Sequence, residues 1–384
     1  MKLSTPSQIP FLSLFFLIVL ATMTSSCSST TLIPSSFQTK EKIRPMVDNS
    51  KEALLNIPYR SLNTSKDLQT IGFGSCADQN QPQPIWSMIE KNNPELFIMM
   101  GDNVYASKKE DKPIVDQYIK LNKVSEFVKL RESIPFLAIW DDHDYGQNDG
   151  GFDNPEKEEA KKAFLKYWGY LKPTLPTNQK ALYHSRIIGK TKKVQVILLD
   201  TRWDRSQLNK NPDFDPLKTD DLLPKIYLPS EDKKSQVLSA EQWQWFESEL
   251  KKPAHLRLII SSIQLIPNDH YFEKWGNFPL EREKFFNLLK KHKIKNSIIL
   301  SGDRHLAAIS QYNIKGLGQI HEVTSSAINR PSRSKTPEKD SSYISEAFLF
   351  TNFGLINIDW KKKIAQVRII DENNKTQLET NIRF

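Results

Sequence analysis

The chain is poor in cysteine, since only Cys27 and Cys76 occur among its 384 residues. At most one disulfide can therefore form within the chain. A lone thiol in an exported protein tends to oxidise, whereas a thiolate bound to a metal ion is protected. Cys76 is accordingly expected to be either a metal ligand or a small buried apolar side chain.

Long hydrophobic runs are also absent, apart from one near the N-terminus. Residues 11–23 form an apolar run of 13 residues, which is too short to span a bilayer comfortably. The small residues at 24–27 (TSSC) that follow resemble a bacterial lipoprotein signal. We predict that residues 1–26 are a signal peptide and that Cys27 becomes a lipidated first residue. The exported protein would then lie in the periplasm or on the cell surface, anchored in the membrane by that lipid.

Thr24 stands three residues before the cysteine, where a large aliphatic residue is usual in such signals. Ordinary secretion and an uncleaved anchor are therefore the alternatives. If Cys27 carries lipid, no intramolecular disulfide is possible.

Blocks of basic charge are missing as well. The 54 Lys and Arg residues outnumber the 45 Asp and Glu residues and give a net charge of +9, but they are scattered along the chain. This spread disfavours nucleic-acid binding, and no specific nucleic-acid or protein partner is indicated. Scattered basic charge indicates either a solvated surface or an attraction for phosphorylated substrates. An apolar content of 38% with eight Trp and twenty Phe is typical of a globular protein.

Residues 27–66 are rich in Ser, Thr, Pro and Lys, and we predict a tether with little structure there. Residues 67–384 form the predicted folded domain. Apolar runs of strand length predict strands at 68–73, 95–100, 134–140, 194–200, 255–261, 297–300 and 321–324, with a closing hairpin of 353–360 and 365–371. Helical patterns lie at 84–91, 113–133, 155–172, 239–251 and 280–291, and a long loop is expected at 206–236.

Polar side chains of ligand type follow several of these strands. In open α/β sheets, sites form where strands end, so the predicted fold class places these side chains together. The most informative stretch is Trp140-Asp141-Asp142-His143-Asp144, directly after an apolar strand. Crowded carboxylates repel one another unless positive charge lies between them, and a metal ion would supply it. The alternative is an acidic surface loop with a structural histidine.

Three further strand ends carry ligand-type residues: Cys76; Asp102 with Tyr105; and Asp303 with His305. Carboxylate and phenolate oxygens beside one thiolate suggest iron together with an oxygen-preferring ion such as calcium. Two adjacent ions can clamp a phosphoryl group, and Asp102 could bridge them. Taken singly, Asp102 could belong to a turn, Tyr105 to the core, and His305 to a satisfied buried position. All of these alternatives would have to hold together to remove the site.

The same motifs resemble those of a known family. The motifs occur along the chain in the same order as in that family: Gly74-Ser75-Cys76, Gly101-Asp102-Asn103-x-Tyr105, Trp140-Asp141-Asp142-His143-Asp144, Asp200-Thr201-Arg202 and Ser301-Gly302-Asp303-Arg304-His305. Between about residues 70 and 330 the chain resembles the alkaline phosphatase D (PhoD-like) family, a branch of the calcineurin-like metallophosphoesterases. The resemblance implies an α/β fold, a four-layer αββα sandwich with mixed sheets. It also implies hydrolysis of phosphate mono- or diesters with Fe³⁺ and Ca²⁺ as the expected ions.

The resemblance assigns roles to individual positions. The iron-ligand positions match Cys76, Asp102 and Tyr105, with His305 or Asp303 completing the set; the second-metal positions match Asp142 or Asp141, with Asn148 as a further oxygen ligand. His143 matches the catalytic histidine, as general acid or electrostatic stabiliser. Arg202 and Arg205 are the candidates for holding substrate phosphate, because a guanidinium fork suits phosphate oxygens. A structural salt bridge is the alternative for Arg205.

The chain also departs from the family pattern. No Arg pair precedes the apolar run, which favours export in the unfolded state with metal loaded afterwards. No separate β-rich domain precedes residue 74, so specificity inferred from larger members does not transfer, and Asp144 stands where Glu is common. The favoured activity is that of a phosphomonoesterase that releases phosphate. The alternatives are a phosphodiesterase or phospholipase-D-like enzyme, and a non-catalytic surface lipoprotein that binds metal or phosphate.

Overall fold

The computed structural model describes Lys51 and residues 54–107, 112–214 and 226–384. The predicted signal peptide and Cys27 lie outside the described residues. Within the described ranges, no helix combines the length and the apolar character needed to cross a membrane. Residues 54–66, which belong to the predicted tether, contain turns but no helix or strand. Leu55 is nevertheless only 1% exposed and belongs to the core, so this part of the segment packs on the domain.

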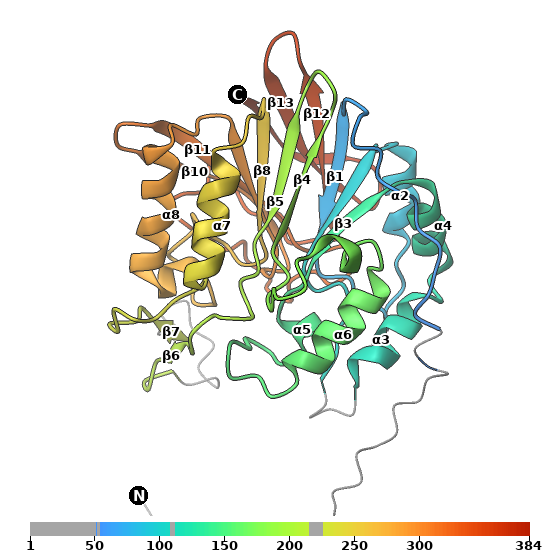
Figure 1. Cartoon of the computed structure of the whole chain (residues 1–384), viewed down its shortest axis with the longest axis horizontal. Coiled ribbons are helices and arrows are strands. Elements are labelled where there is room, and N and C mark those ends of the chain that lie inside the picture. Colours follow the sequence, from blue (N-terminus) through green and yellow to red (C-terminus); the bar gives the residue numbers. More distant parts are fainter. Residues whose placement is uncertain (1–50, 52–53, 108–111, 215–225) are drawn as a thin grey trace, which may run out of the picture. The chain divides into compact units, whose positions relative to one another are not determined.

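Two six-stranded mixed sheets form the centre of the domain (Figure 1). The first sheet has the strand order β14-β13-β12-β1-β2-β3, in which β1, β2 and β3 are parallel to one another. Its strands are β1 (Thr70–Gly74), β2 (Leu96–Met100), β3 (Phe136–Ile139), β12 (Asn352–Asp359), β13 (Ile364–Asp371) and β14 (Thr376–Arg383). β12 joins β1 in antiparallel register, with Ile71 opposite Ile356. The apolar parallel strands therefore lie inside the sheet, and the C-terminal strands extend it on one side.

The second sheet has the order β10-β11-β9-β8-β5-β4, in which β11, β9, β8 and β5 are parallel. Its strands are β4 (His184–Ile188), β5 (Val194–Leu198), β8 (Leu256–Ser261), β9 (Ser297–Ser301), β10 (Ala307–Ile314) and β11 (Gly318–Ser325). A small ribbon of β6 (Asn209–Lys210) and β7 (Tyr227–Leu228) lies outside both sheets.

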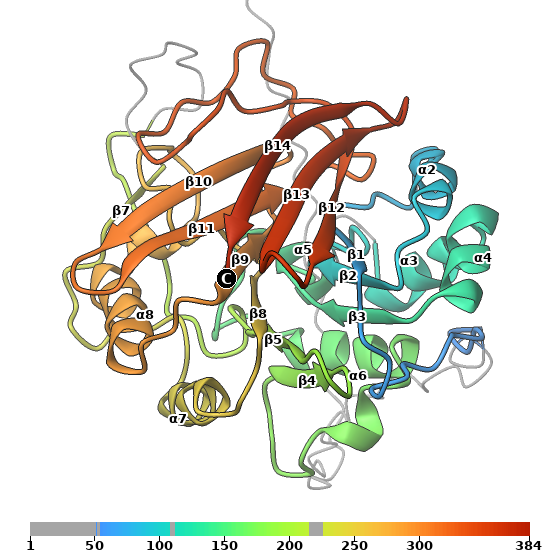
Figure 2. The same ribbon diagram turned by 90° about the horizontal axis from the view of Figure 1, so that it is seen from above.

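Helices flank the two sheets. They are α2 (Ile85–Lys91), α3 (Ile114–Leu121), α4 (Ser125–Ser133), α5 (Asp142–Tyr145), α6 (Lys157–Tyr167), α7 (Ala240–Leu250) and α8 (Pro279–Lys291), with 3₁₀ turns η2 (Lys172–Thr174) and η3 (Trp275–Asn277). The short helix α5 lies where the strands end (Figure 1). Figures 1 and 2 show α7 and α8 beside the second sheet, and α2, α3 and α4 beside the first. The predicted αββα sandwich with mixed sheets is thus confirmed.

The two-residue period of β5 explains how its sheet is covered on both faces. Val196 and Leu198 belong to the large core shared with strands of the first sheet. Ile197 points the other way and packs in a second core with Phe246 of α7 and Phe285 of α8. Because both faces are buried, the strand is a continuous apolar run rather than an alternating one. Ser239 caps α7 as expected, accepting a hydrogen bond from Gln242 N at 3.3 Å.

The structure differs from the predicted elements in two ways. The single helix expected at 113–133 is divided into α3 and α4, because Val124 adopts an extended backbone conformation. Five strands were not predicted: β4, β10 and β14, and the short β6 and β7 inside the loop expected at 206–236. In β14 only Ile382 is buried, and although Thr376, Leu378, Thr380 and Ile382 alternate with polar residues, this weak strand pattern was not recognised.

Candidate metal centre

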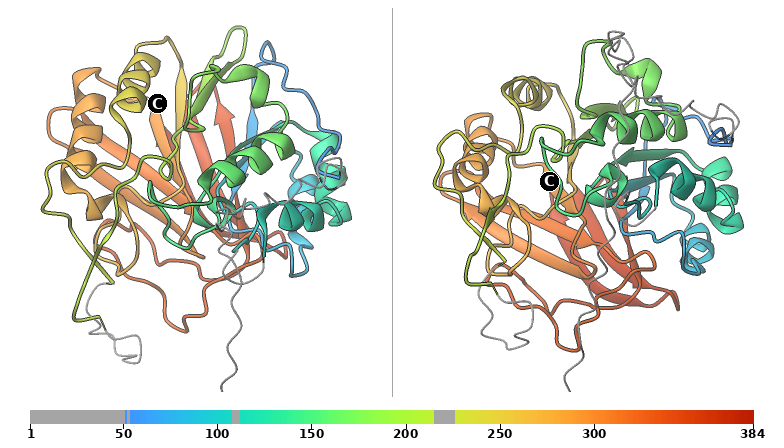
Figure 3. Two further views of the ribbon diagram at one scale, coloured as in Figure 1. Left: turned by 60° about the horizontal axis from the view of Figure 1, so that its bottom comes forward. Right: turned by 90° about the horizontal axis from the view of Figure 1, so that it is seen from below.

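Four predicted ligand residues occupy the same position relative to a strand. Cys76, Asp102, Asp141 and Asp303 each lie two residues beyond the last residue of β1, β2, β3 and β9. The first three strands are parallel neighbours, and β9 lies among the parallel strands of the second sheet. The ends of both sheets therefore deliver these side chains to one place, at the end of the domain where α5 lies. The right panel of Figure 3 views the domain from this side.

The ligand loops are held in an unusual backbone conformation. Cys76, Asp102, Asp303 and His305 all have positive φ angles, of 62°, 49°, 67° and 55°. Such angles are uncommon for residues with a Cβ atom and often accompany functional sites. Gly101, with φ of 107°, shows why the loop needs glycine, because a Cβ there would lie 2.4 Å from Cβ of Asp141. The close approach of the β2 and β3 loops depends on this glycine.

Three overlapping groups of side chains could each hold a metal ion. They are Cys76, Asp102 and His305; Asp102, Asp142 and His143; and Asp141, Asp142 and Asp303, and within each group the ligand atoms lie within 4.8 Å of one another. Asp102 is shared by the first two groups, and Asp142 by the last two. Two neighbouring ions bridged by a carboxylate would use this arrangement.

Tyr105 joins the first group through its hydroxyl. Tyr105 OH donates to Asp102 Oδ2 at 3.0 Å and lies 3.1 Å from His305 Nε2. Cys76 Sγ lies 3.5 Å from the same Asp102 oxygen. The structure thus brings together all four predicted residues of the iron set, including His305. Asp303 belongs instead to the third group, together with Asp141 and Asp142.

The loop after β3 presents His143 and Asp142 to the second group. His143 is partly exposed, its backbone N–H donates to Asp102 Oδ1 at 3.3 Å, and its ring lies 4.3 Å from the Tyr105 ring, measured between centroids. Asp142 Oδ2 accepts a hydrogen bond from the backbone N–H of Asp149 at 2.8 Å. Asn148 is exposed, and its side-chain nitrogen donates to Asp149 Oδ2 at 2.9 Å. Its role as a ligand stays a prediction.

Arg202 and Arg205 lie in a buried ion-pair network rather than on an exposed surface. Arg202 Nε donates to Asp141 Oδ1 at 2.5 Å, and its Nη1 donates to Glu273 Oε2 at 2.6 Å. Arg205 Nε pairs with Glu273 Oε1 at 2.8 Å, and these arginine side chains have no exposed surface. Ser262 Oγ donates to the same Asp141 oxygen at 2.5 Å. This network orients Asp141, and a direct contact of Arg202 with phosphate stays a prediction.

The burial of so many carboxyl groups has a clear electrostatic consequence. Burial raises the pKa of Asp102 well above its ordinary value, and the charges of Cys76 and Asp142 raise it further. Burial likewise raises the pKa of Asp303, together with the charges of Asp141 and Asp142. A cation would reverse these shifts, because its charge favours the ionised carboxylates.

The donor atoms left without partners fit the same conclusion. Asp141 Oδ2 and Asp142 Oδ1 are buried and have no hydrogen-bond partner among the described residues. Buried carboxylate oxygens are normally hydrogen-bonded, so the lone pairs of these two atoms are free to bind a metal ion. Burial lowers the pKa of His143, and it lowers that of His305 to about 3. Both imidazoles are therefore neutral at neutral pH, the form that binds metal or donates one N–H.

The family model of the PhoD-like phosphatases matches residues 71–369 of this chain. The chain belongs to the PhoD-like phosphatase family. The match includes every strand that delivers a predicted ligand except the first residue of β1. The resemblance inferred from the motifs is therefore confirmed.

Individual relatives of this PhoD-like chain agree with the family match. It is similar to alkaline phosphatase D of Bacillus subtilis (strain 168), with 22% identity over 291 residues, which are 64% of this chain and 47% of the relative. The chain thus spans about half the length of that curated relative. The solved structure of PhoD superposes with a TM-score of 0.56 at 16% identity, covering 84% of this chain and 74% of that one. A dimetal phosphatase from Danio rerio gives a TM-score of 0.53 at 10% identity, covering 83% and 100%. These structural likenesses support the fold.

Two residues beside the PhoD-like ligand set were not found from the sequence. Ser326 Oγ lies 3.1 Å from Cys76 Sγ and accepts a hydrogen bond from His305 N at 2.8 Å. It directly follows β11, so the rule that strand ends carry the site would have found it had that strand been predicted to its end. Glu273 comes from a segment without an apolar strand before it, and no sequence signal indicates its place.

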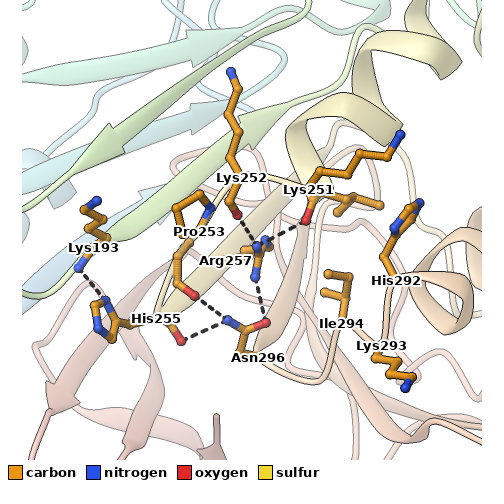
Figure 4. A pocket seen from close by; sticks show the side chains of 12 residues that line it. Lys193, Lys251, Lys252, Pro253, His255, Arg257, His292, Lys293, Ile294 and Asn296 are labelled. Atoms are coloured by element: carbon orange, nitrogen blue, oxygen red, sulfur yellow. Dashed lines mark hydrogen bonds between the residues drawn. The ribbon is translucent and has the colours of Figure 1, made fainter.

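A basic pocket lies at the opposite ends of the same parallel strands (Figure 4). Lys193, His255 and Asn296 immediately precede β5, β8 and β9, and all three line this pocket. Arg257 is held inside it by Lys252 O at 2.5 Å and by Asn296 Oδ1 at 2.8 Å. Arg257 also donates to Leu250 O, the last carbonyl of α7, at 3.2 Å. The length of the strands separates this pocket from the ligand groups.

Proposed function

We propose that this chain is an exported, metal-dependent phosphoesterase that hydrolyses phosphate monoesters and releases phosphate. The observation that carries the proposal is the overlap of the three ligand groups, with Asp102 and Asp142 each shared between two of them. Membership of the PhoD-like phosphatase family and the likeness to a dimetal phosphatase fold support it.

The residues present suit two unlike ions, and we propose Fe³⁺ and Ca²⁺. A thiolate, a phenolate and an imidazole from Cys76, Tyr105 and His305 suit iron, whereas carboxylate oxygens alone suit calcium. Bound ions would neutralise charge on the phosphoryl group and activate a water molecule as nucleophile. Replacing Cys76 by Ala is expected to lose bound iron, measured by elemental analysis, and full iron occupancy in that variant would contradict the ligand assignment.

His143 is the residue of this chain that we propose to act on the substrate. It is partly exposed, lies beside the Asp102 group, and its neutral ring can donate an N–H to a phosphoryl or leaving-group oxygen. A contact of this kind that strengthens in the transition state typically contributes ~10²- to 10⁴-fold to the rate. His143→Ala should therefore lose rate by about that factor while keeping the metal held by the two groups that lack His143.

The substrate class is tested with two chromogenic esters. The protein of residues 28–384, supplied with iron and calcium, is assayed on p-nitrophenyl phosphate and on bis-p-nitrophenyl phosphate, with His143→Ala as control. A strong preference for the monoester supports the proposed function. A strong preference for the diester instead favours the phosphodiesterase or phospholipase-D-like alternative. If the metal-loaded wild type hydrolyses neither ester, and His143→Ala behaves in the same way, the non-catalytic lipoprotein is favoured.

Export and anchoring are part of the proposal and have their own test. We propose that residues 1–26 are removed and that a lipid on Cys27 tethers the enzyme to a membrane. Full-length protein expressed in a bacterium should partition into detergent, and Cys27→Ser should move it to the aqueous phase. Equal partitioning of the two proteins would contradict lipidation.

A further inference from the structure

The two arginines expected to bind phosphate are fully buried and donate mainly to the protein, with Arg202 Nη2 left without a hydrogen-bond partner within the described residues. Arg202 lies between two buried carboxylates, Asp141 and Glu273. Arg205 pairs with Glu273 and also donates to the backbone oxygen of Ser206 at 2.6 Å. A substrate anion approaching from solvent would find neither guanidinium exposed. The cation that meets the substrate must therefore come from elsewhere.

Arg330 has the properties that these two arginines lack. Its side chain is 36% exposed, and its guanidinium carbon lies 4.0 Å from the centroid of the Tyr105 ring. The Tyr105 hydroxyl contacts Asp102 and His305, and its ring packs on His143. Arg330 is thus one aromatic ring away from the first two ligand groups and open to solvent.

Asp78 holds Arg330 in this place. Arg330 Nη1 donates to Asp78 Oδ2 at 2.7 Å, while no hydrogen bond from its Nη2 or Nε is found within the described residues. The neighbouring Asn329 accepts from Asp78 N at 2.7 Å and donates to Asp78 O at 2.8 Å. Asn329 N also donates to Cys76 O at 3.4 Å, which fixes the segment against the metal loop. One edge of the guanidinium fork is anchored, and the other edge is left for a ligand.

We infer, on the basis of the proposed function, that Arg330 is the substrate-binding arginine of this site and that Asp78 positions it. Its guanidinium binds a non-bridging oxygen of the phosphate group at the mouth of the metal centre. A planar fork suits a tetrahedral phosphate better than a lysine does, because two parallel N–H groups can meet two oxygens. Nothing in this arrangement requires the buried Arg202 to leave Asp141.

The competing explanation is a purely structural one, in which Arg330 only joins two loops by its ion pair and its contact with Tyr105. Arg330→Gln distinguishes the substrate-binding role from the structural role, because it removes the cation but keeps a polar side chain of similar length. Arg333→Gln is the matched control, because Arg333 is exposed and lies in the same segment. This substitution removes the same charge from the protein. Inorganic phosphate is the probe, used as a competitive inhibitor of p-nitrophenyl phosphate hydrolysis and as a ligand in calorimetry of the metal-loaded protein.

Arg330→Gln is expected to raise both the KM for p-nitrophenyl phosphate and the inhibition constant of phosphate by about 10- to 100-fold, as for the loss of one charge-assisted hydrogen bond. Its metal content and Tm should match those of the wild type, and Asp78→Asn should show a smaller rise. Arg333→Gln should stay within about twofold of the wild type in both constants.

Normal phosphate binding and KM in a metal-loaded Arg330→Gln protein would overturn the inference and leave the proposed function standing. Loss of metal or of Tm with an unchanged KM would overturn it as well, in favour of the structural role. If Arg330→Gln does not fold, Arg330→Lys keeps the charge without the fork, and an unchanged KM in that variant likewise overturns the inference. A metal-loaded wild type that neither binds phosphate nor hydrolyses either ester would overturn both proposals.

Discussion

The two ends of the parallel strands handle charge in opposite ways. Where β9 ends, Asp303 joins a group of buried carboxylates, and burial raises the pKa values of Asp303 and Asp141 in this group. Where β5 begins, Lys193 belongs to a basic pocket open to solvent. Water solvates the exposed lysines of the basic pocket at almost no cost, whereas the crowded buried carboxylates of the metal centre are stabilised by a cation. The difference indicates that one end of the strands is a metal-binding site and that the other is solvated surface.

The largest expected effect comes from the residue shared by two ligand groups. Asp102→Asn removes a charged ligand and should lower kcat/KM on p-nitrophenyl phosphate by about 10³-fold, with loss of bound metal. Asp359→Asn, at an exposed end of β12, is the control and should leave the rate within about twofold. Retention of metal and rate in the Asp102 variant would remove the distinction between the two ends.

Stability should also depend on which end is altered. Arg202→Met leaves Asp141 and Glu273 buried without their shared cation, and should lower the free energy of unfolding by ~3–5 kcal/mol. Lys291→Met removes an exposed partner of Glu247 and should cost only ~0–1 kcal/mol. Urea denaturation of the metal-free proteins measures both changes, and equal losses would contradict the comparison.

The metal-free protein should lose stability as the pH rises. Burial raises the pKa of Asp149 from 3.8 to about 7, with Glu273 and Asp142 adding to the shift. The folded state therefore holds a proton that the unfolded state has released, so the stabilisation is complete below pH ~4 and disappears as pH passes about 7. Between these values the free energy of unfolding should fall by about 1.4 kcal/mol per pH unit for each such carboxyl.

Asp149→Asn should reduce this slope, and bound metal should remove the contribution of Asp102 and Asp303. Denaturation of the metal-free wild type at pH 4, 5, 6 and 7 gives the slope directly. The buried His305, whose pKa is lowered to about 3, contributes the opposite slope below pH ~6.5, so the comparison of the two proteins is decisive. Equal slopes in the wild type and Asp149→Asn would contradict the prediction.

The smallest expected effect concerns the serine beside the thiol. Ser326→Ala removes the hydroxyl that contacts Cys76 Sγ and accepts from His305 N, and should weaken iron binding by about 10-fold. Ser310→Ala is a matched control, because Ser310 Oγ in β10 is buried but has no hydrogen-bond partner within the described residues. Competition with a chelator measures both affinities, and equal values would show that Ser326 does not position the thiolate.

Much of the fold was predictable because its inner strands are continuous apolar runs. β2 and β5 are buried along their whole length, and both were predicted within a residue or two. The strand β14 was missed because only Leu378 and Ile382 in its alternating pattern are large apolar residues, and its pairing with β13 holds it in the sheet. No Gly or Pro lies near Val124, so the sequence gives no signal for the division of the helix there.

The candidate site divides in the same way. Cys76, Asp102 and Asp303 could be predicted because each follows an apolar strand by two residues, and parallel strands end at one edge. The sequence by itself therefore determined the family, the sandwich and the set of candidate ligands. Only the tertiary structure decided which cations are committed and which are open, because burial of Arg202 and exposure of Arg330 arise from contacts between segments far apart in the chain.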